Sequence, residues 1–178
     1  MTLGKFAVRG PAVLALALAL GSCGGGPAPL QFVCPPPLTV QDAGRITHFR
    51  DGAGRDPRDI AYEAALVSAG SSCKALAKAI DVTVVLVVSV AAGPSVTPGQ
   101  TQVPYFVRVI DGTGRVMQGQ DFTADFRLSS ANPRGESREE LSLSLPFGQI
   151  NDLTGYRIAV GLKPSQEELN YNRRQGGR

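Results

Sequence analysis

The sequence predicts an all-β domain, a β-sandwich that is followed by a short C-terminal helix. Apolar and polar residues alternate with a period of two in several segments after about residue 79, which is typical of strands. Turn signals rich in Gly, Pro and Asn separate these segments. The composition is that of a globular chain, because 43% of the 178 residues are hydrophobic and 19% are charged. These observations exclude wholesale disorder.

The first residues are predicted to be a signal peptide. Lys5 and Arg9 form a positive region, and residues 12–20 are an unbroken apolar run. That run is far shorter than the ~20 residues of a membrane-spanning helix, but it fits the core of a signal peptide. The four residues that end this segment resemble the lipobox of bacterial lipoproteins: Leu20, Gly21, Ser22 and Cys23. The alternative is an ordinary signal peptide with a chance cysteine.

The lipobox resemblance implies where the protein is located. In such lipoproteins a peptidase cuts before the cysteine, so residues 1–22 would be removed. The thiol of Cys23 would carry diacylglycerol, and its new amine would carry a further acyl chain such as palmitate. Such an anchor holds a protein on a membrane without a transmembrane helix. In Gram-negative bacteria an Asp after the cysteine commonly retains lipoproteins in the inner membrane. Gly24 stands at that position, so the resemblance implies the outer membrane, facing the periplasm.

The rest of the chain divides into three parts. Residues 23–36 contain the Cys23 anchor and a Gly- and Pro-rich stretch, which is typical of a flexible linker. Residues 37–164 carry the alternating pattern and are predicted to form the sandwich. Residues 165–178 are predicted to be a short helix and a disordered tail, with a capping box starting a helix over 167–174.

Two cysteines remain once Cys23 is assigned to lipid. In an oxidising periplasm, Cys34 and Cys73 are expected to form a disulfide. These cysteines are 39 residues apart. Closing a loop of about 40 residues stabilises the folded chain by about 4 kcal/mol in the chain-entropy model. A metal site is the alternative, but the chain has one histidine, His48, and no CxxC motif. The sequence therefore predicts no metal site and no cofactor.

The alternating segments predict the strands in order. Residues 81–92 (DVTVVLVVSVAA) are apolar on both faces, which indicates a central or partly covered strand. Residues 103–111 form the next strand, and Asp-Gly-Thr-Gly after it indicates a hairpin turn. The return strand is expected to direct alternate side chains inward: Phe122, Ala124, Phe126 and Leu128. Residues 129–138 are polar and are predicted to be a loop.

Two further strands close the predicted sandwich, over residues 141–145 and 156–162, with Pro146 ending the first of them. The segment 153–160 (LTGYRIAV) resembles the tyrosine-corner strand of immunoglobulin and fibronectin type III-like domains. In that family the Tyr hydroxyl bonds to upstream backbone. The resemblance implies an immunoglobulin-like sandwich and a structural role for Tyr156, with a binding role as the alternative. The chain has no Trp, so kinship with antibody domains is not implied.

Residues 56–70 carry conflicting signals. Asp56 as N-cap, Pro57 in the first turn and Gly70 past the end would punctuate a helix. Against this, apolar residues alternate along the segment, as in a strand. We favour the strand, because a strand at residues 38–40 would otherwise lack a neighbour.

The search for catalytic residues finds no complete set. There is no GxSxG motif, and His48 is expected to be a solvated loop residue. Residues 51–56 lack the alternating oxygen ligands of a calcium loop and are expected to form a turn with Arg–Asp pairing. Glu139 and Glu140 are expected to protect a sheet edge. The sequence therefore does not predict an enzyme.

The charge balance excludes a nucleic-acid partner. Without Lys5 and Arg9 the chain has 16 basic against 15 acidic side chains, too few to attract phosphate backbones. We expect a membrane-anchored periplasmic lipoprotein that is a non-catalytic structural or interaction module of the envelope. Its partner would be an envelope protein or peptidoglycan, met for instance by strand addition. The alternative is a lipoprotein that binds a small ligand or glycan between sandwich and helix, in a cavity lined by Phe106, Phe122 and Phe126. A hydrolase without a recognisable motif is less favoured.

Overall fold

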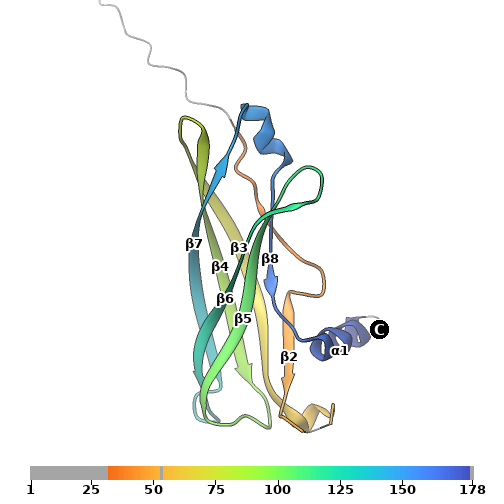
Figure 1. Ribbon diagram of the computed structural model, residues 1–178. Coiled ribbons are helices and arrows are strands. Elements are labelled where there is room, and N and C mark those ends of the chain that lie inside the picture. The colour runs from red at the N-terminus through yellow and green to blue at the C-terminus, as the bar shows by residue number, and fades with distance from the viewer. Residues whose placement is uncertain (1–31, 53, 177–178) are drawn as a thin grey trace, which may run out of the picture.

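The computed structural model describes residues 32–52 and 54–176, which form two four-stranded sheets packed face to face (Figure 1). The first sheet has the order β1 (Pro37–Thr39), β8 (Arg157–Leu162), β5 (Gly99–Ile110) and β6 (Val116–Leu128). The second has the order β2 (Arg45–Phe49), β3 (Ile60–Ala75), β4 (Ala79–Ala92) and β7 (Arg134–Pro146). The predicted β-sandwich with a short C-terminal helix is confirmed. The predicted signal peptide and most of the linker lie outside the described residues.

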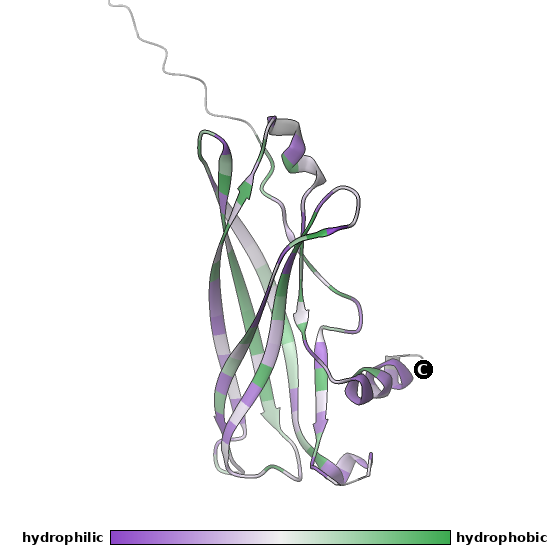
Figure 2. Ribbon diagram, in the orientation of Figure 1, coloured by the Kyte–Doolittle hydropathy of each residue, from purple (hydrophilic) through white to green (hydrophobic). Residues whose placement is uncertain are grey.

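The core lies between the two sheets. Strand β4 directs five apolar side chains inward, each at most 3% exposed: Val82, Val84, Leu86, Val88 and Val90. Strand β5 faces them with Val103, Tyr105, Val107 and Val109. Figure 2 shows β4 as largely hydrophobic. Each large apolar side chain buried in this way contributes roughly 1.5–3 kcal/mol, so this interface is the main source of stability. The predicted central position of the strand at 81–92 is confirmed, since β4 lies between β3 and β7.

The segment 56–70 is a strand from Ile60 onward, as favoured above. The helix-start signals specify only one 3₁₀ turn, η1 (Pro57–Asp59), in which the Asp56 carboxylate accepts a hydrogen bond from the Arg58 N–H. The reason given for preferring the strand is wrong, however. Strand β1 pairs in parallel with β8, whereas β3 belongs to the opposite sheet. The chain crosses between sheets after β1, so β1 finds its neighbour near the C-terminus.

The predicted loop at 129–138 is too long. Strand β7 begins at Arg134, and only the residues between Leu128 and Arg134 form the turn that connects the two sheets. Arg134 to Arg138 pair in register with residues Ala91 to Val87 of β4. Because β7 lies at the edge of its sheet, its outward side chains meet water. A polar sequence is therefore compatible with a strand at this position.

The predicted C-terminal helix is α1 (Gln166–Gly176). Its capping box is formed as expected: the Glu168 N–H donates to Ser165 Oγ (3.3 Å), and the Glu168 carboxylate accepts from the Ser165 N–H (2.7 Å). Figure 2 shows α1 as mostly hydrophilic. Within the described part of the chain, no helix is long and apolar enough to cross a membrane.

Candidate functional site

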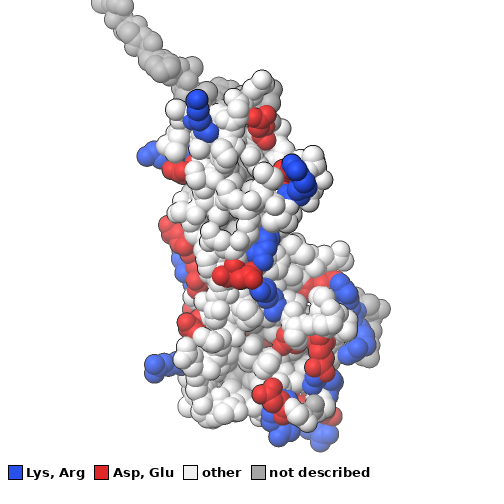
Figure 3. All heavy atoms as spheres, viewed as in Figure 1, with Lys and Arg blue, Asp and Glu red and all other residues white. Residues whose placement is uncertain are grey.

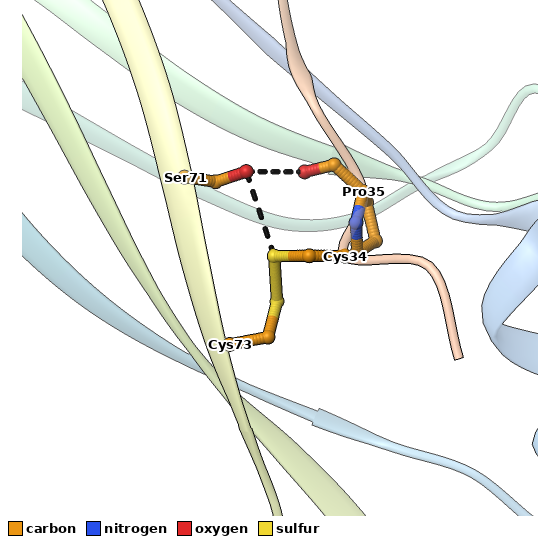
Figure 4. Close-up of a disulfide and its surroundings, with 4 residues drawn as sticks. All are labelled: Cys34, Pro35, Ser71 and Cys73. Atoms are coloured by element: carbon orange, nitrogen blue, oxygen red, sulfur yellow. Dashed lines mark hydrogen bonds between the residues drawn. A yellow bond between two sulfur atoms is a disulfide. The ribbon is translucent and has the colours of Figure 1, made fainter. Parts of the chain in front are cut away.

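A disulfide fixes the beginning of the sandwich. Cys34 and Cys73 are bonded, with their Cα atoms 5.6 Å apart, which confirms the predicted pair. Beside the bond, the Ser71 hydroxyl donates to the Pro35 carbonyl at 2.8 Å (Figure 4). These contacts tie the incoming chain to β3, while β1 directly after it joins the other sheet. The lipobox residues, Leu20, Gly21, Ser22 and Cys23, lie outside the described residues.

Tyr156 connects the two sheets. It follows η2 (Ile150–Gly155), and its hydroxyl donates to the Pro146 carbonyl at 3.0 Å. Pro146 ends β7 of the second sheet, and Tyr156 leads directly into β8 of the first. This hydrogen bond to upstream backbone is of the kind that the resemblance to tyrosine-corner domains implies for Tyr156.

A second cluster lies where α1 packs against β2. The expectation of a solvated loop histidine is wrong, because His48 lies in β2 and its Nδ1 is 2.7 Å from Glu168 Oε1 in α1. The ring also stacks on Tyr62, its cross-strand neighbour in β3, with 4.7 Å between ring centroids. The side chain of His48 is 40% exposed and that of Glu168 12%. The imidazole is therefore held in one orientation while one side of it remains open to solvent.

The His48–Glu168 contact shifts the pKa of both groups in opposite directions. The hydrogen bond with Glu168 raises the pKa of His48 above its usual value. Burial raises the pKa of Glu168, but hydrogen bonds from His48 and Ser165 outweigh it, so that the pKa of this carboxyl is lowered. Burial, with the nearby Glu168 charge, raises the pKa of Tyr62 to about 12. The site thus combines a hydrogen-bonded imidazole–carboxylate pair with a phenol that stays protonated at neutral pH.

Further contacts hold α1 in place. Tyr171 packs edge-on against Phe49, with 4.9 Å between ring centroids. Asn172 donates from Nδ2 to the Arg45 carbonyl at 2.7 Å, so the helix satisfies a backbone group of the edge strand β2. Figure 3 shows acidic and basic side chains interspersed over this corner of the molecule. An aromatic contact and a hydrogen bond to backbone thus both attach α1 to β2.

The turn before β3 carries Arg–Asp pairs, but their arginines lie outside residues 51–56, for which the sequence predicted such pairing. The Arg58 guanidinium lies 2.9 Å from the Asp56 carboxylate, and that of Arg50 lies 2.9 Å from Asp59. Arg55 forms an ion pair with Glu167 of α1. The turn is thereby connected to the helix by charge as well as by packing.

Three open hollows surround this corner. Two flank His48, with volumes of about 400 and 500 Å³; the first includes Ser165 and Asp51 in its lining, and the second Tyr62 and Gln102. The third, of about 600 Å³, lies between α1 and the second sheet. Its lining combines one aromatic ring with charged and amide groups: Asp42, Gly44, Arg45, Thr47, Glu63, Tyr171, Asn172 and Gln175.

The His48–Glu168 pair can be compared with the groups of a hydrolytic site. A carboxylate that orients an imidazole is one part of a hydrolytic site, and a nucleophile bonded to the ring is the other. Among the described residues, no Ser, Thr or Cys side chain is hydrogen-bonded to His48. Nor does any group of three or more His, Cys, Asp or Glu side chains in the described segments have the arrangement of a metal site.

The predicted cavity lined by phenylalanines is not formed. Phe122 and Phe126 of β6 face the sandwich interior, where Phe122 stacks on Tyr105 at 5.3 Å. Phe106 lies on the opposite face of the sheet, under the Arg108 guanidinium at 5.2 Å. Alternation along the strands separates these rings, and α1 packs on the other sheet.

Sequence reasoning missed Tyr62 and Glu168 as neighbours of His48, and Tyr171 as a neighbour of Phe49. The capping box identified Glu168 as a helix-start residue, but nothing local connects it to a strand 120 residues earlier. Comparison with models of known protein families finds no match, and comparison with curated proteins finds no significant relative. The functional argument therefore depends on the sequence motifs and the geometry of this chain.

Proposed function

We propose that this protein is a lipid-anchored lipoprotein of the bacterial outer membrane, facing the periplasm, and that it is a non-catalytic interaction module of the envelope. The observation that carries the proposal is that the N-terminal end, where the anchor would be attached, and the α1–β2 surface, where a partner would bind, lie far apart on the sandwich. The described chain begins near the Cys34–Cys73 disulfide at one end of the sandwich, and the corner of α1 and β2 lies toward the other end (Figure 1).

The disulfide suits a protein that is held by its N-terminus. Strand β1 pairs over three residues only, so a pull on the incoming chain would easily detach it from β8. Cys34 precedes β1 and is covalently joined to Cys73 in the sixteen-residue strand β3. A force applied at Cys23 would therefore reach the second sheet directly, and β1 would remain paired.

The α1–β2 corner supplies the interaction surface in this proposal. Its groups include exposed charges of both signs together with a partly exposed imidazole and partly exposed phenols, which can recognise polar partners such as envelope proteins or peptidoglycan. Partners of this kind are met by many weak polar contacts around a few aromatic anchors.

A second candidate is glycan binding in the 600 Å³ groove beside α1. Tyr171 provides an aromatic face on which a sugar ring can pack, and the Asp42 and Glu63 carboxylates can accept hydrogen bonds from sugar hydroxyls. This candidate predicts saturable binding of soluble peptidoglycan fragments in calorimetry, with Glu63→Gln weakening it. A groove that takes up no fragment at millimolar concentration would exclude it.

The anchoring part is tested by labelling and fractionation. The full chain and its Cys23→Ala variant are expressed in a Gram-negative host with a clickable palmitate analogue. We expect the label on the parent chain, which sediments with outer membranes, and no label on the variant. Label that persists in the variant, or a parent chain found wholly in the soluble fraction, would contradict the proposal.

The interaction part is tested in crosslinked envelopes. We expect the parent chain to retain a reproducible partner that is reduced when Tyr171→Ala and Glu63→Gln are combined. Thr123→Ala, on the outer face of β6 and away from the corner, is the matched control and should retain the partner. Equal recovery from all three chains would place the interaction elsewhere.

A further inference from the structure

Strand β7 has a free edge. Among the described strands it pairs with β4 alone and ends the order of its sheet. An exposed strand edge offers backbone donors and acceptors to another strand. What distinguishes this edge is the charge pattern that it carries.

The hydrogen bonds show which backbone groups face outward. The Pro133 carbonyl accepts from Ala92 and the Phe147 N–H donates to Lys78, so odd-numbered residues are directed toward β4. The Ser144 carbonyl instead accepts from Gln118 Nε2 at 3.0 Å. Since backbone direction alternates along a strand, the even-numbered residues face the free edge. Gln118 closes that edge at Ser144, whereas the even-numbered residues from Arg134 to Ser142 are exposed.

The side chains on the outer face alternate in sign along this accessible part. They are exposed, and within the described residues none of them forms an ion pair: Arg134, Glu136, Arg138 and Glu140. Figure 3 shows both basic and acidic groups along the left border of the molecule, where Figure 1 places β7. A pattern of this kind can complement itself when the strand is reversed.

We propose that β7 pairs antiparallel with β7 of a second copy, about a two-fold axis at Ser137. In this register Arg134 faces Glu140 of the second copy, and Glu136 faces its Arg138. The symmetry repeats both contacts, which gives four opposite-charge pairs. The same residues have outward-facing N–H and C=O groups, so each facing pair is also a hydrogen-bonded backbone pair. The β2-β3-β4-β7 sheets of the two copies would then join into one continuous sheet.

Other registers are less complementary. Moving the axis by one residue, to Glu136, sets Glu136 against itself and Arg134 against Arg138. Moving it to Arg138 likewise opposes Arg with Arg and Glu with Glu. Moving the axis by two residues, to position 135 or 139, leaves only two opposite-charge contacts. These are Arg134 with Glu136 in the first case and Arg138 with Glu140 in the second. Because directly opposed like charges destabilise a strand pair, the charges select the Ser137 register.

The pairing rests in one respect on the proposed function, because an interface of this length is weak in dilute solution. Anchoring both copies in one membrane raises their effective concentration, which makes such an interface significant. Cys73 lies level with Leu143 through β4, six residues from Ser137. The two disulfides would therefore lie about 40 Å apart along the strands, on opposite sides of the axis. Both tethers reach one bilayer when the strands lie along the membrane plane.

Site-directed crosslinking tests the register in the full chain, in cells. Two Ser137→Cys chains would bring their Cα atoms to about 4.5 Å in a non-hydrogen-bonded pair, which is within the range for a disulfide. Ser142→Cys is the matched control, because its counterpart in the second copy would be about 34 Å away. After mild oxidation we expect a strong disulfide-linked dimer for Ser137→Cys and roughly tenfold less for Ser142→Cys. Equal yields, or no dimer with either, would overturn the proposal.

Charge exchange provides the second test. In the Ser137→Cys background, R134E with R138E makes all four facing pairs acidic, and E136R with E140R makes them all basic. Each chain alone should lose the dimer by more than about tenfold. Co-expression of the two, with different tags, should restore a mixed dimer, which also shows that both variants fold. Failure of the mixed dimer to form would refute the charge register.

The test separates this inference from the anchoring proposal. Cys23→Ala would lower the dimer yield by diluting the chains, but the preference for position 137 over 142 would remain. Loss of membrane attachment with a retained preference would overturn the anchor alone. Retained attachment without the preference would overturn the pairing alone.

Discussion

Removing the disulfide is expected to destabilise the domain by about 4 kcal/mol, from the chain-entropy value for a loop of roughly 40 residues. The two cysteines are 39 residues apart, and the loop between them contains β1, β2 and most of β3. For a domain of this size, the loss corresponds to a fall in Tm of about 12–15 °C. Cys34→Ser with Cys73→Ser is the appropriate variant, because it leaves no unpaired thiol.

Urea denaturation of the purified mature chain, followed by circular dichroism, measures this loss. The double variant and the parent chain under reducing conditions should agree, since both lack the same crosslink. Ser71→Ala is the control for local contacts and should cost about 1 kcal/mol, because it removes the hydrogen bond to Pro35 and the 3.6 Å contact with Cys34 Sγ but keeps the disulfide. A double variant within about 1 kcal/mol of the parent would refute the reasoning, since the unfolded chain would then not be restrained by the loop.

Two further predictions concern the corner site and the packing. Because the pKa of His48 is raised and that of Glu168 lowered, their contact stabilises fully between about pH 4.5 and 6.5 and weakens as pH rises through the His48 pKa. Glu168→Gln should therefore cost about 0.5–1 kcal/mol at pH 5.5 and less at pH 8.5 in urea titrations, and an equal loss at both would contradict the ion pair. A Cβ at Gly93 would lie 2.2 Å from the Ile60 carbonyl oxygen, whereas one at Gly70 meets nothing within 4 Å. Thermal unfolding should show Gly93→Ala destabilised by roughly 2 kcal/mol or more and Gly70→Ala nearly unchanged; similar Tm values would contradict the close approach.

The sandwich could be predicted because the pattern of apolar and polar residues along its strands reflects which faces are buried. The run at 81–92 is apolar on both faces because the inner side chains of β4 are buried in the core and its outer ones are half-buried between β3 and β7. The disulfide could also be predicted, since the assignment of Cys23 to lipid leaves two cysteines, which are expected to pair in an oxidising compartment. Both inferences required only local pattern and counting.

Edges and local signals were harder to interpret. Residues 134–138 look like a loop because an edge strand needs few apolar residues. Their backbone hydrogen bonds to β4 make them a strand, and the polar composition does not reveal that pairing. Asp56 and Pro57 specify the first turn of a helix and nothing beyond it, so the alternating residues from Ile60 onward determined the outcome. In both segments, strand pairing determined the structure, and the local loop or helix-start signals did not.

The corner site depended on contacts between distant parts of the chain. His48 has no local partner that distinguishes it from a solvated residue, and Glu168 was recognisable only as a cap. Tyr62 faces His48 because of the β2–β3 register, and Tyr171 reaches Phe49 only when α1 lies beside β2. Such a site becomes visible once the topology is known.

The most direct test of the central proposal is the mass of the mature N-terminal peptide. We predict that the chain purified from Gram-negative membranes begins at Cys23 and carries a diacylglycerol on the thiol and a third acyl chain on the amine. A mature chain that begins at another residue, or a Cys23 peptide without lipid, would contradict the account of this protein as an anchored envelope module.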